Sequence, residues 1–203
     1  MILHNFFVLE GIDGSGTSTQ LKILQEKLEK QGKKAFFSTE PTSGSTGQFL
    51  RRMLSGEIKL HPATAAFLFA ADRNEHIYGK NGIKEHLENG DICVSDRYLF
   101  SSLAYQSQEC GKELPAKINE DFPLPEILFY FSIDPAVSLK RIIGRGVTEI
   151  YEKEEFLRKT EAEYRRVIND FKGKSSMRIV EIDATKSIEE ISTIIWNEIS
   201  ADK

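Results

Sequence analysis

One stretch near the amino terminus limits the possible folds more than any other. Residues 11–18 read Gly-Ile-Asp-Gly-Ser-Gly-Thr-Ser. This spacing is that of a phosphate-binding loop, Gly-x-x-x-x-Gly-Lys-Ser/Thr, with Thr17 in place of the lysine. An apolar run at 6–9 precedes the loop, and a segment with helical periodicity from 18 to about 31 follows it. Because strand, glycine loop and helix form the setting in which such loops bind polyphosphates, we favour that role over a glycine-rich turn without a nucleotide.

The loop contains most of the candidate phosphate-binding residues. Its glycines let the backbone approach a polyphosphate, and the amides at the start of the following helix point toward it. Ser18 has the hydroxyl that such loops offer to Mg²⁺, and is therefore a candidate metal ligand. The phosphate-binding candidates are Gly11, Gly14, Ser15, Gly16, Thr17, Ser18 and Thr19. What the loop lacks is the mobile lysine cation.

Apolar, β-rich runs alternate with longer helix-periodic stretches along the whole chain. The runs are at 6–9, 35–37, 92–95, 127–133 and 178–182. Helix starts are marked by Asp134-Pro135 and by the capping box at 187–190. Such alternation predicts βαβ units and hence an α/β three-layer sandwich, a five-stranded parallel sheet with helices on both faces. Ligands of these sheets bind beyond the carboxyl ends of the strands, so chemistry is expected there.

Length, charge and cysteine content exclude several classes of protein. At 203 residues the chain is expected to form a single domain, 1–203. Its 31 acidic residues against 27 Lys and Arg leave a net charge of -4, which argues against a binder of nucleic acid or of membranes. Two cysteines are too few for a disulfide framework or a zinc site, and no run is long enough to span a bilayer. We therefore expect a cytoplasmic protein.

A second motif follows the third predicted strand. Residues 94–106 read Val-Ser-Asp-Arg-Tyr-Leu-Phe-Ser-Ser-Leu-Ala-Tyr-Gln. Here Arg97 can bind a phosphate through two hydrogen bonds, and Asp96 can organise Mg²⁺-bound water. Next to a phosphate-binding loop, this run resembles the signature of thymidylate kinases, which pass phosphate from ATP to dTMP. The resemblance covers the chain from Phe7 to about Ile195 and implies the P-loop NTPase fold of nucleoside-monophosphate kinases.

The resemblance also implies an acceptor site for dTMP. Phe69 and Arg73 lie four residues apart on one face of what resembles the family's base-binding helix, where they would stack on thymine and bond its carbonyl edge. Taken alone, Phe69 would be read as core and Arg73 as an ion-paired residue. Glu40-Pro41 resembles the family's Glu-Pro turn, and Arg51 its acceptor-phosphate arginine. The implied dTMP-binding residues are Asp13, Glu40, Pro41, Arg51, Phe69, Arg73, Arg97, Ser101, Ser102, Tyr105 and Gln106.

The resemblance assigns roles to two later segments as well. Residues 141–152 are similar to the lid that closes over ATP in small-molecule kinases, although alone they would be read as a solvated loop. A lid arginine is implied to reach the γ-phosphate, with Arg145 the first candidate and Arg141 the second. Asp183 and Ala184 resemble the adenine-side loop. The implied catalytic residues are Asp13, Arg97, Arg145 and Arg141, and the implied metal ligands are Ser18, Asp96 and Glu152.

Thr17 decides between the functional hypotheses. Removing one charge-stabilising group from an active site typically costs on the order of 10²–10³ in rate, so another cation must replace the lysine if the protein is a kinase. The alternatives are a nucleotide-binding regulator with weak or no activity, and a related nucleoside or nucleoside-monophosphate kinase. We expect a working, Mg²⁺-dependent dTMP kinase, because the residues implied to read dTMP are retained together. Family members are commonly homodimers, which implies the same here.

Overall fold

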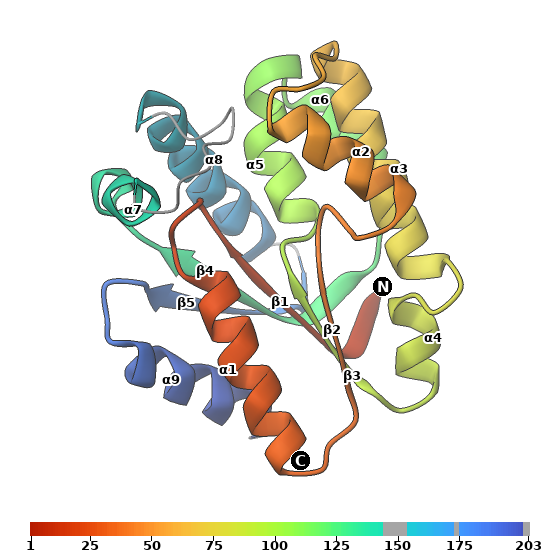
Figure 1. Ribbon diagram of the computed structural model, residues 1–203, viewed down its shortest axis with the longest axis vertical. Helices are drawn as coiled ribbons and strands as arrows, with labels where there is room; N and C mark the ends of the chain where they lie inside the picture. The colour runs from red at the N-terminus through yellow and green to blue at the C-terminus, as the bar shows by residue number, and fades with distance from the viewer. Residues whose placement is uncertain (144–153, 173–174, 201–203) are drawn as a thin grey trace.

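The computed structural model describes residues 1–143, 154–172 and 175–200. A five-stranded, all-parallel sheet runs through its centre (Figure 1). The strands are β1 (Ile2–Gly11), β2 (Ala35–Thr39), β3 (Ile92–Asp96), β4 (Leu124–Ser132) and β5 (Arg178–Asp183), in the spatial order β2-β3-β1-β4-β5. The predicted α/β three-layer fold with five parallel strands is confirmed.

The central strand β1 owes its place to its apolar sequence. Phe6, Phe7, Val8 and Leu9 are at most 2% exposed, as expected for a strand that is covered on both faces. β1 begins earlier than the predicted 6–9. Its first four residues are not buried and include the polar His4 and Asn5, so they lack the continuous apolar character on which the prediction rested. β4 likewise starts before the predicted run and ends at Ser132.

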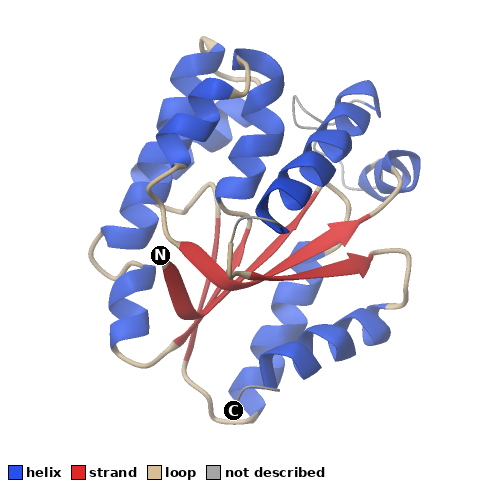
Figure 2. Ribbon diagram, turned by 180° about the vertical axis from the view of Figure 1, so that it is seen from behind, coloured by secondary structure: helices blue, strands red, loops and turns tan. Residues whose placement is uncertain are grey.

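Helices cover both faces of the sheet, as the two opposite views show (Figures 1 and 2). α1 (Thr17–Lys30) and α9 (Ile188–Ser200) lie together on one face, whereas α3 (Pro62–Tyr78), α5 (Leu99–Cys110) and α8 (Glu154–Lys172) cover the other. The remaining helices are α2 (Ser45–Leu54), α4 (Ile83–Glu88), α6 (Glu113–Asn119) and α7 (Pro135–Ile142).

The predicted helix starts are confirmed by their hydrogen bonds. Asp134 accepts the amide of Ala136 at 2.7 Å, with a proline at the first position of α7. Ser187 and Glu190 form the reciprocal capping box before α9. Within the described ranges, none of the helices combines the length and the apolar character needed to cross a membrane.

Candidate functional site

A cavity of about 230 Å³ opens at the carboxyl ends of β1, β2 and β3. The strand order reverses at β1, which lies between β3 and β4. In parallel α/β sheets, ligands usually bind at the carboxyl ends of the strands beside such a reversal. The loop after β1 forms one wall, and residues of α2, α3 and α5 form the others. The lining residues are Ile12, Asp13, Gly14, Gly16, Thr17, Ser18, Thr19, Thr39, Glu40, Pro41, Arg51, Leu54, Phe69, Arg73, Asp96, Arg97, Ser101, Ser102, Tyr105 and Gln106. Every residue that the sequence predicted for dTMP binding is among them.

The loop between β1 and α1 has the backbone of an anion-binding turn. Gly16 is the N-cap of α1 at φ 101°, a left-handed conformation that favours glycine. Gly14, at φ 79°, passes so close to α7 that a Cβ there would lie 2.7 Å from the carbonyl oxygen of Ser138. The amides of Thr17 and Ser18 start the helix, where N–H groups have no partner four residues back. Helix start and loop together suit a polyphosphate.

Two predicted loop residues do not line the cavity. These are Gly11 and Ser15. Ser15 is 2% exposed, and its hydroxyl has no hydrogen-bond partner in the described part of the chain. A Cβ at Gly11 would lie 2.7 Å from that hydroxyl oxygen, so the Ser15 side chain packs against the loop's own backbone instead of facing the cavity.

Ser18 and Asp96 meet at the loop end of the cavity. The Ser18 hydroxyl donates to Oδ2 of Asp96 at 2.5 Å, while the buried Oδ1 of Asp96 has no hydrogen-bond partner among the residues described. Mg²⁺ at nucleotide sites takes one or two protein oxygens and completes its shell with water and phosphate oxygens. A hydroxyl beside a carboxylate with a free oxygen fits that requirement. The third predicted metal ligand, Glu152, lies outside the described residues.

Arg97 is held in an uncommon backbone conformation. Its φ of 74° lies in the left-handed region, which is rare for arginine. The Arg97 amide donates to the carbonyl oxygen of Leu9 at 2.9 Å, and the Ser95 hydroxyl donates to the Arg97 carbonyl oxygen at 2.7 Å. Backbone outliers that the surroundings fix in this way often belong to functional sites.

The guanidinium of Arg97 joins the phosphate-binding loop to α5. It donates to the carboxylate of Asp13 and to the carbonyl oxygen of Gly11, and it lies 5.3 Å over the ring of Tyr105. The Tyr105 hydroxyl donates to the other carboxylate oxygen of Asp13 at 3.0 Å. The carboxylate of Asp13 is therefore held by the side chains of Arg97 and Tyr105.

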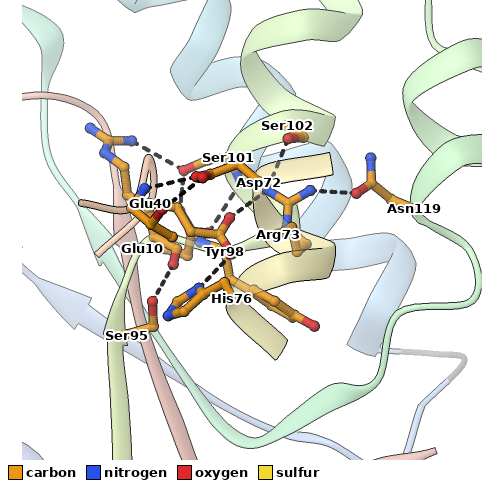
Figure 3. A network of polar contacts seen from close by, with 12 residues as sticks. Glu10, Glu40, Asp72, Arg73, His76, Ser95, Tyr98, Ser101, Ser102 and Asn119 are labelled. Atoms are coloured by element: carbon orange, nitrogen blue, oxygen red, sulfur yellow. Dashed lines mark hydrogen bonds and ion pairs between the residues drawn. The ribbon is translucent and has the colours of Figure 1, made fainter. Parts of the chain in front are cut away.

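A buried polar network surrounds Glu40 in the wall of the cavity (Figure 3). Arg73 is 1% exposed and donates to Glu40 at 2.6 Å, to Ser102 at 3.1 Å and to Asn119. The second oxygen of Glu40 lies 3.0 Å from Nδ1 of His76. Both terminal nitrogens of Arg73 are thus engaged within the protein, which makes the arginine part of a rigid wall. His76 and Asn119 are members of this wall that the sequence did not single out.

Arg51 differs from the other two arginines of the cavity. Arg73 and Arg97 pair with Glu40 and Asp13, whereas Arg51 donates to the carbonyl oxygen of Pro41 and forms no ion pair with a carboxylate in the part of the chain that the structure describes. A cationic group without a counter-charge at the cavity wall is suited to an anion.

The residues predicted for the donor side are distributed differently. Arg141 lies in the last turn of α7, so the predicted 141–152 segment overlaps that helix, and its guanidinium donates to the carbonyl oxygens of Gly14 and Ala184 at 3.4 and 3.0 Å. Asp183 does not line the main cavity and accepts hydrogen bonds from Thr185. Arg145 lies outside the described residues.

Sequence reasoning missed Glu10, the last side chain before the loop. It is fully buried, and this burial raises the pKa of its carboxyl from 4.5 to about 7, against the opposing effect of the Arg97 charge. A charged residue that ends an apolar run was the available signal. Its partner Tyr164 lies on α8 and gave no signal, because a tyrosine on an amphipathic helix is ordinary core.

Comparisons with known proteins point to one family. The family model described as thymidylate kinase matches residues 9–195. A protein of Treponema pallidum (strain Nichols) named "Putative thymidylate kinase" is 41% identical over 200 residues, 98% of this chain and 96% of that protein. A "Probable thymidylate kinase" of Methanococcus maripaludis (strain S2 / LL) is 39% identical over 97% of this chain and 96% of its own. A "Thymidylate kinase" of Leptospira borgpetersenii is 38% identical, with 92% and 88% covered.

Proposed function

This chain belongs to the thymidylate kinase family and transfers the γ-phosphate of ATP to dTMP, giving dTDP; on that premise we propose which of its residues perform each task. The observation that carries the proposal is that five of the seven candidate loop residues and all the candidate acceptor residues line one cavity. Phosphoryl transfer needs two anionic substrates positioned in line and their charge neutralised, and one shared cavity permits this.

The acceptor half of the cavity binds dTMP. Arg51 and Arg97 hold its phosphate, Phe69 stacks on thymine, and the buried wall of Arg73 and Gln106 faces the edge of the base. Asp13 fixes Arg97 and, with Tyr105, closes the side next to the sugar. Glu40, Pro41, Ser101 and Ser102 complete this half. The acceptor phosphate oxygen is already a nucleophile, so the site needs no strong general base.

The donor half binds ATP. The loop residues from Gly14 to Thr19 hold its phosphates, and Asp183 and Ala184 lie on the adenine side. Arg141, whose guanidinium bonds the carbonyl oxygens of Gly14 and Ala184, is the second candidate for the arginine that reaches the γ-phosphate. Ser18 and Asp96 hold Mg²⁺, with Glu152 as a further ligand; the ion neutralises phosphate charge when bound. Arg145 supplies the positive charge that Thr17 does not, and the 141–152 segment acts as the lid.

A coupled assay with a panel of acceptors tests the proposal. Purified protein with ATP and Mg²⁺ is expected to phosphorylate dTMP in preference to dUMP, dCMP, dGMP and thymidine. Arg51→Ala is expected to raise the KM for dTMP without changing the KM for ATP, because this arginine faces only the acceptor. Equal changes in both values would contradict the division of the cavity. Arg52→Ala on the same helix is the matched control, since Arg52 pairs with Glu57 at the surface.

The proposal extends to the assembly and the compartment. Phe67 and Tyr78 are 54% and 47% exposed and lie three turns apart on one face of α3, so we place a second copy of the chain on that face. Residues 1–203 form one domain, because β5 near the carboxyl end completes the sheet that β1 begins. The thiols of Cys93 and Cys110 are free, which suits a reducing cytoplasm.

A further inference from the structure

Glu10 lies near the end of β1, and its carboxylate accepts four hydrogen bonds. Oε1 accepts the backbone amides of Tyr98 and Ser101 at 2.7 and 3.1 Å. Oε2 accepts the hydroxyls of Ser101 and Tyr164, both at 2.7 Å. Figure 3 shows Glu10 beside Ser101 and Tyr98 in the same network. An ionised carboxylate has about four acceptor sites and no hydrogen to donate, so these four donors match the charged form.

The two amides belong to the start of α5, which has no cap of its own. Tyr98 is the N-cap residue, but its side chain makes no capping hydrogen bond. Glu10 therefore caps α5 from the neighbouring strand, and its negative charge suits the positive end of the helix. Arg97 directly precedes this cap and is itself bound to the carbonyl oxygen of Leu9. Two consecutive residues of β1 thus fix the backbone around Arg97: Leu9 accepts the amide of Arg97, and Glu10 accepts the amide of Tyr98.

The two hydroxyls connect Glu10 to the guanidinium of Arg97. Nη1 of Arg97 lies 3.2 Å from the Ser101 hydroxyl and 3.4 Å from the Tyr164 hydroxyl. A guanidinium only donates, so each hydroxyl must offer it a lone pair and direct its own hydrogen elsewhere. The two hydroxyl oxygens also lie 2.8 Å from each other, but only ionised Glu10 can accept both hydrogens at once, each at 2.7 Å. A proton on Oε2 would oblige one hydroxyl to turn away from this arrangement.

We propose that Glu10 is a positioning residue for phosphoryl transfer, which in its ionised form caps α5, orients the hydroxyls of Ser101 and Tyr164, and so sets the Arg97 guanidinium that holds the acceptor phosphate. The inference rests on the proposed role of Arg97. It extends the site to Glu10 on β1 and Tyr164 on α8, which do not line the cavity.

The carboxyl of Glu10 titrates near neutral pH. Burial raises the pKa of this carboxyl to about 7, so both protonation states are populated near neutrality. The other titratable groups that surround Glu10 and Arg97 are Asp13 after β1, Asp96 on β3, Tyr105 on α5, Tyr130 on β4 and Tyr164 on α8. Burial raises the pKa of all three tyrosines far above neutrality, so they keep their protons there.

Steady-state kinetics of Glu10→Gln test the positioning role. Glutamine keeps the shape and one carbonyl oxygen for the two amides, but it places an N–H donor where Oε2 stood and so imitates the protonated acid. We expect the KM for dTMP to rise about ten- to hundredfold, the effect of a lost hydrogen bond to a charged group, with the KM for ATP unchanged. Tyr164→Phe removes one of the two hydroxyls and should shift the same constant in the same direction.

Tyr130→Phe is the matched control. Tyr130 is buried beside Tyr164, with ring centroids 5.6 Å apart, but its hydroxyl bonds Glu161 and not Glu10. This variant should keep the kinetic constants of the unaltered chain. Neither tyrosine hydroxyl bonds Oε1 of Glu10, the oxygen that accepts the two α5 amides. The two tyrosine variants therefore answer the question even if Glu10→Gln does not fold.

A pH profile separates positioning from a merely structural role. The ratio of kcat/KM for dTMP between the unaltered chain and Glu10→Gln should climb from near unity at about pH 5.5 to its full value at about pH 8.5, since the ratio cancels the titration of dTMP. A flat ratio, equal rises in both KM values, or unchanged constants in Glu10→Gln or Tyr164→Phe would overturn the inference. An unchanged KM for dTMP in Arg97→Ala would instead refute the proposed role of Arg97.

Discussion

At the scale of single residues, Thr17 removes the one cation that the phosphate-binding loop normally brings to the transferred phosphate. Because the loss of such a group costs on the order of 10²–10³ in rate, we expect Arg145→Ala to lower kcat by about that factor if Arg145 supplies the charge. Adding Thr17→Lys to Arg145→Ala should then restore most of kcat. Turnover measured at saturating ATP and dTMP decides this.

A matched substitution tests charge against length. Thr17→Met in the Arg145→Ala background provides a long side chain without a charge and should restore nothing. Rescue by methionine, or an undiminished kcat in Arg145→Ala alone, would show that the missing lysine is compensated elsewhere.

Glu10 predicts a pH dependence of stability. The unfolded chain ionises this carboxyl near 4.5, whereas the folded chain keeps the proton until about 7. The folded state therefore binds more protons between these values, and the stabilisation that is complete below pH 4.5 is lost as pH rises toward 7. The loss relative to Glu10→Gln should be on the order of 3 kcal/mol in the free energy of unfolding.

Urea unfolding of both proteins across this pH window measures the difference. Tyr130→Phe provides the reference, because Tyr130 keeps its proton throughout and its difference from the unaltered chain should stay constant. If the difference between the unaltered chain and Glu10→Gln also stays constant, the carboxyl does not titrate with a raised pKa.

At the scale of elements, α2 and α3 hold the loop that follows β2. The Thr42 amide and hydroxyl both donate to the buried carboxylate of Asp72 on α3, each at 2.7 Å. On the other side, Gly47 of α2 lies so close that a Cβ there would collide with the Thr42 backbone. The loop that carries Glu40 and Pro41 is thereby clamped between two helices.

Gly47→Ala should force this clamp apart. We expect a destabilisation of about 1–3 kcal/mol from overpacking. We also expect a raised KM for dTMP, because Glu40 and Pro41 of the displaced loop line the part of the cavity that we propose binds dTMP. Urea unfolding and dTMP kinetics test this together. Ser45→Ala, on an exposed position of the same helix, should leave both unchanged. Equal behaviour of the two variants would contradict the close approach.

The elements also show what the sequence could predict. Strand positions, layer order and the phosphate-binding loop were accessible, because apolar runs, caps and glycine spacing are local signals. The pairing of Arg73 with Glu40 and Asn119 was not accessible, since it joins side chains that lie 33 and 46 residues apart in the chain. The same holds for Glu10 and Tyr164, which are separated by 154 residues. Such contacts arise from tertiary packing, which leaves no periodicity in the sequence.

At the scale of the whole molecule, the exposed Phe67 and Tyr78 on one face of α3 predict self-association. Phe67→Asp should convert the proposed dimer to a monomer, since a charge at the centre of an apolar contact is left unpaired on burial. Analytical ultracentrifugation measures the change. Val137→Asp, at an exposed apolar position on α7, should not alter the sedimentation. A monomeric unaltered chain, or a dimer that survives Phe67→Asp, would contradict the placement of the second copy.

The central position of β1 also has a consequence for how the chain acquires its shape during synthesis. β1 emerges first from the ribosome, but both strands that pair with it come much later, β3 at 92–96 and β4 at 124–132. Both strands that flank this very apolar strand are therefore present only after residue 132 has been made. Such long-range pairing slows folding and leaves the nascent chain prone to aggregate. Newly made copies would be natural clients of chaperones.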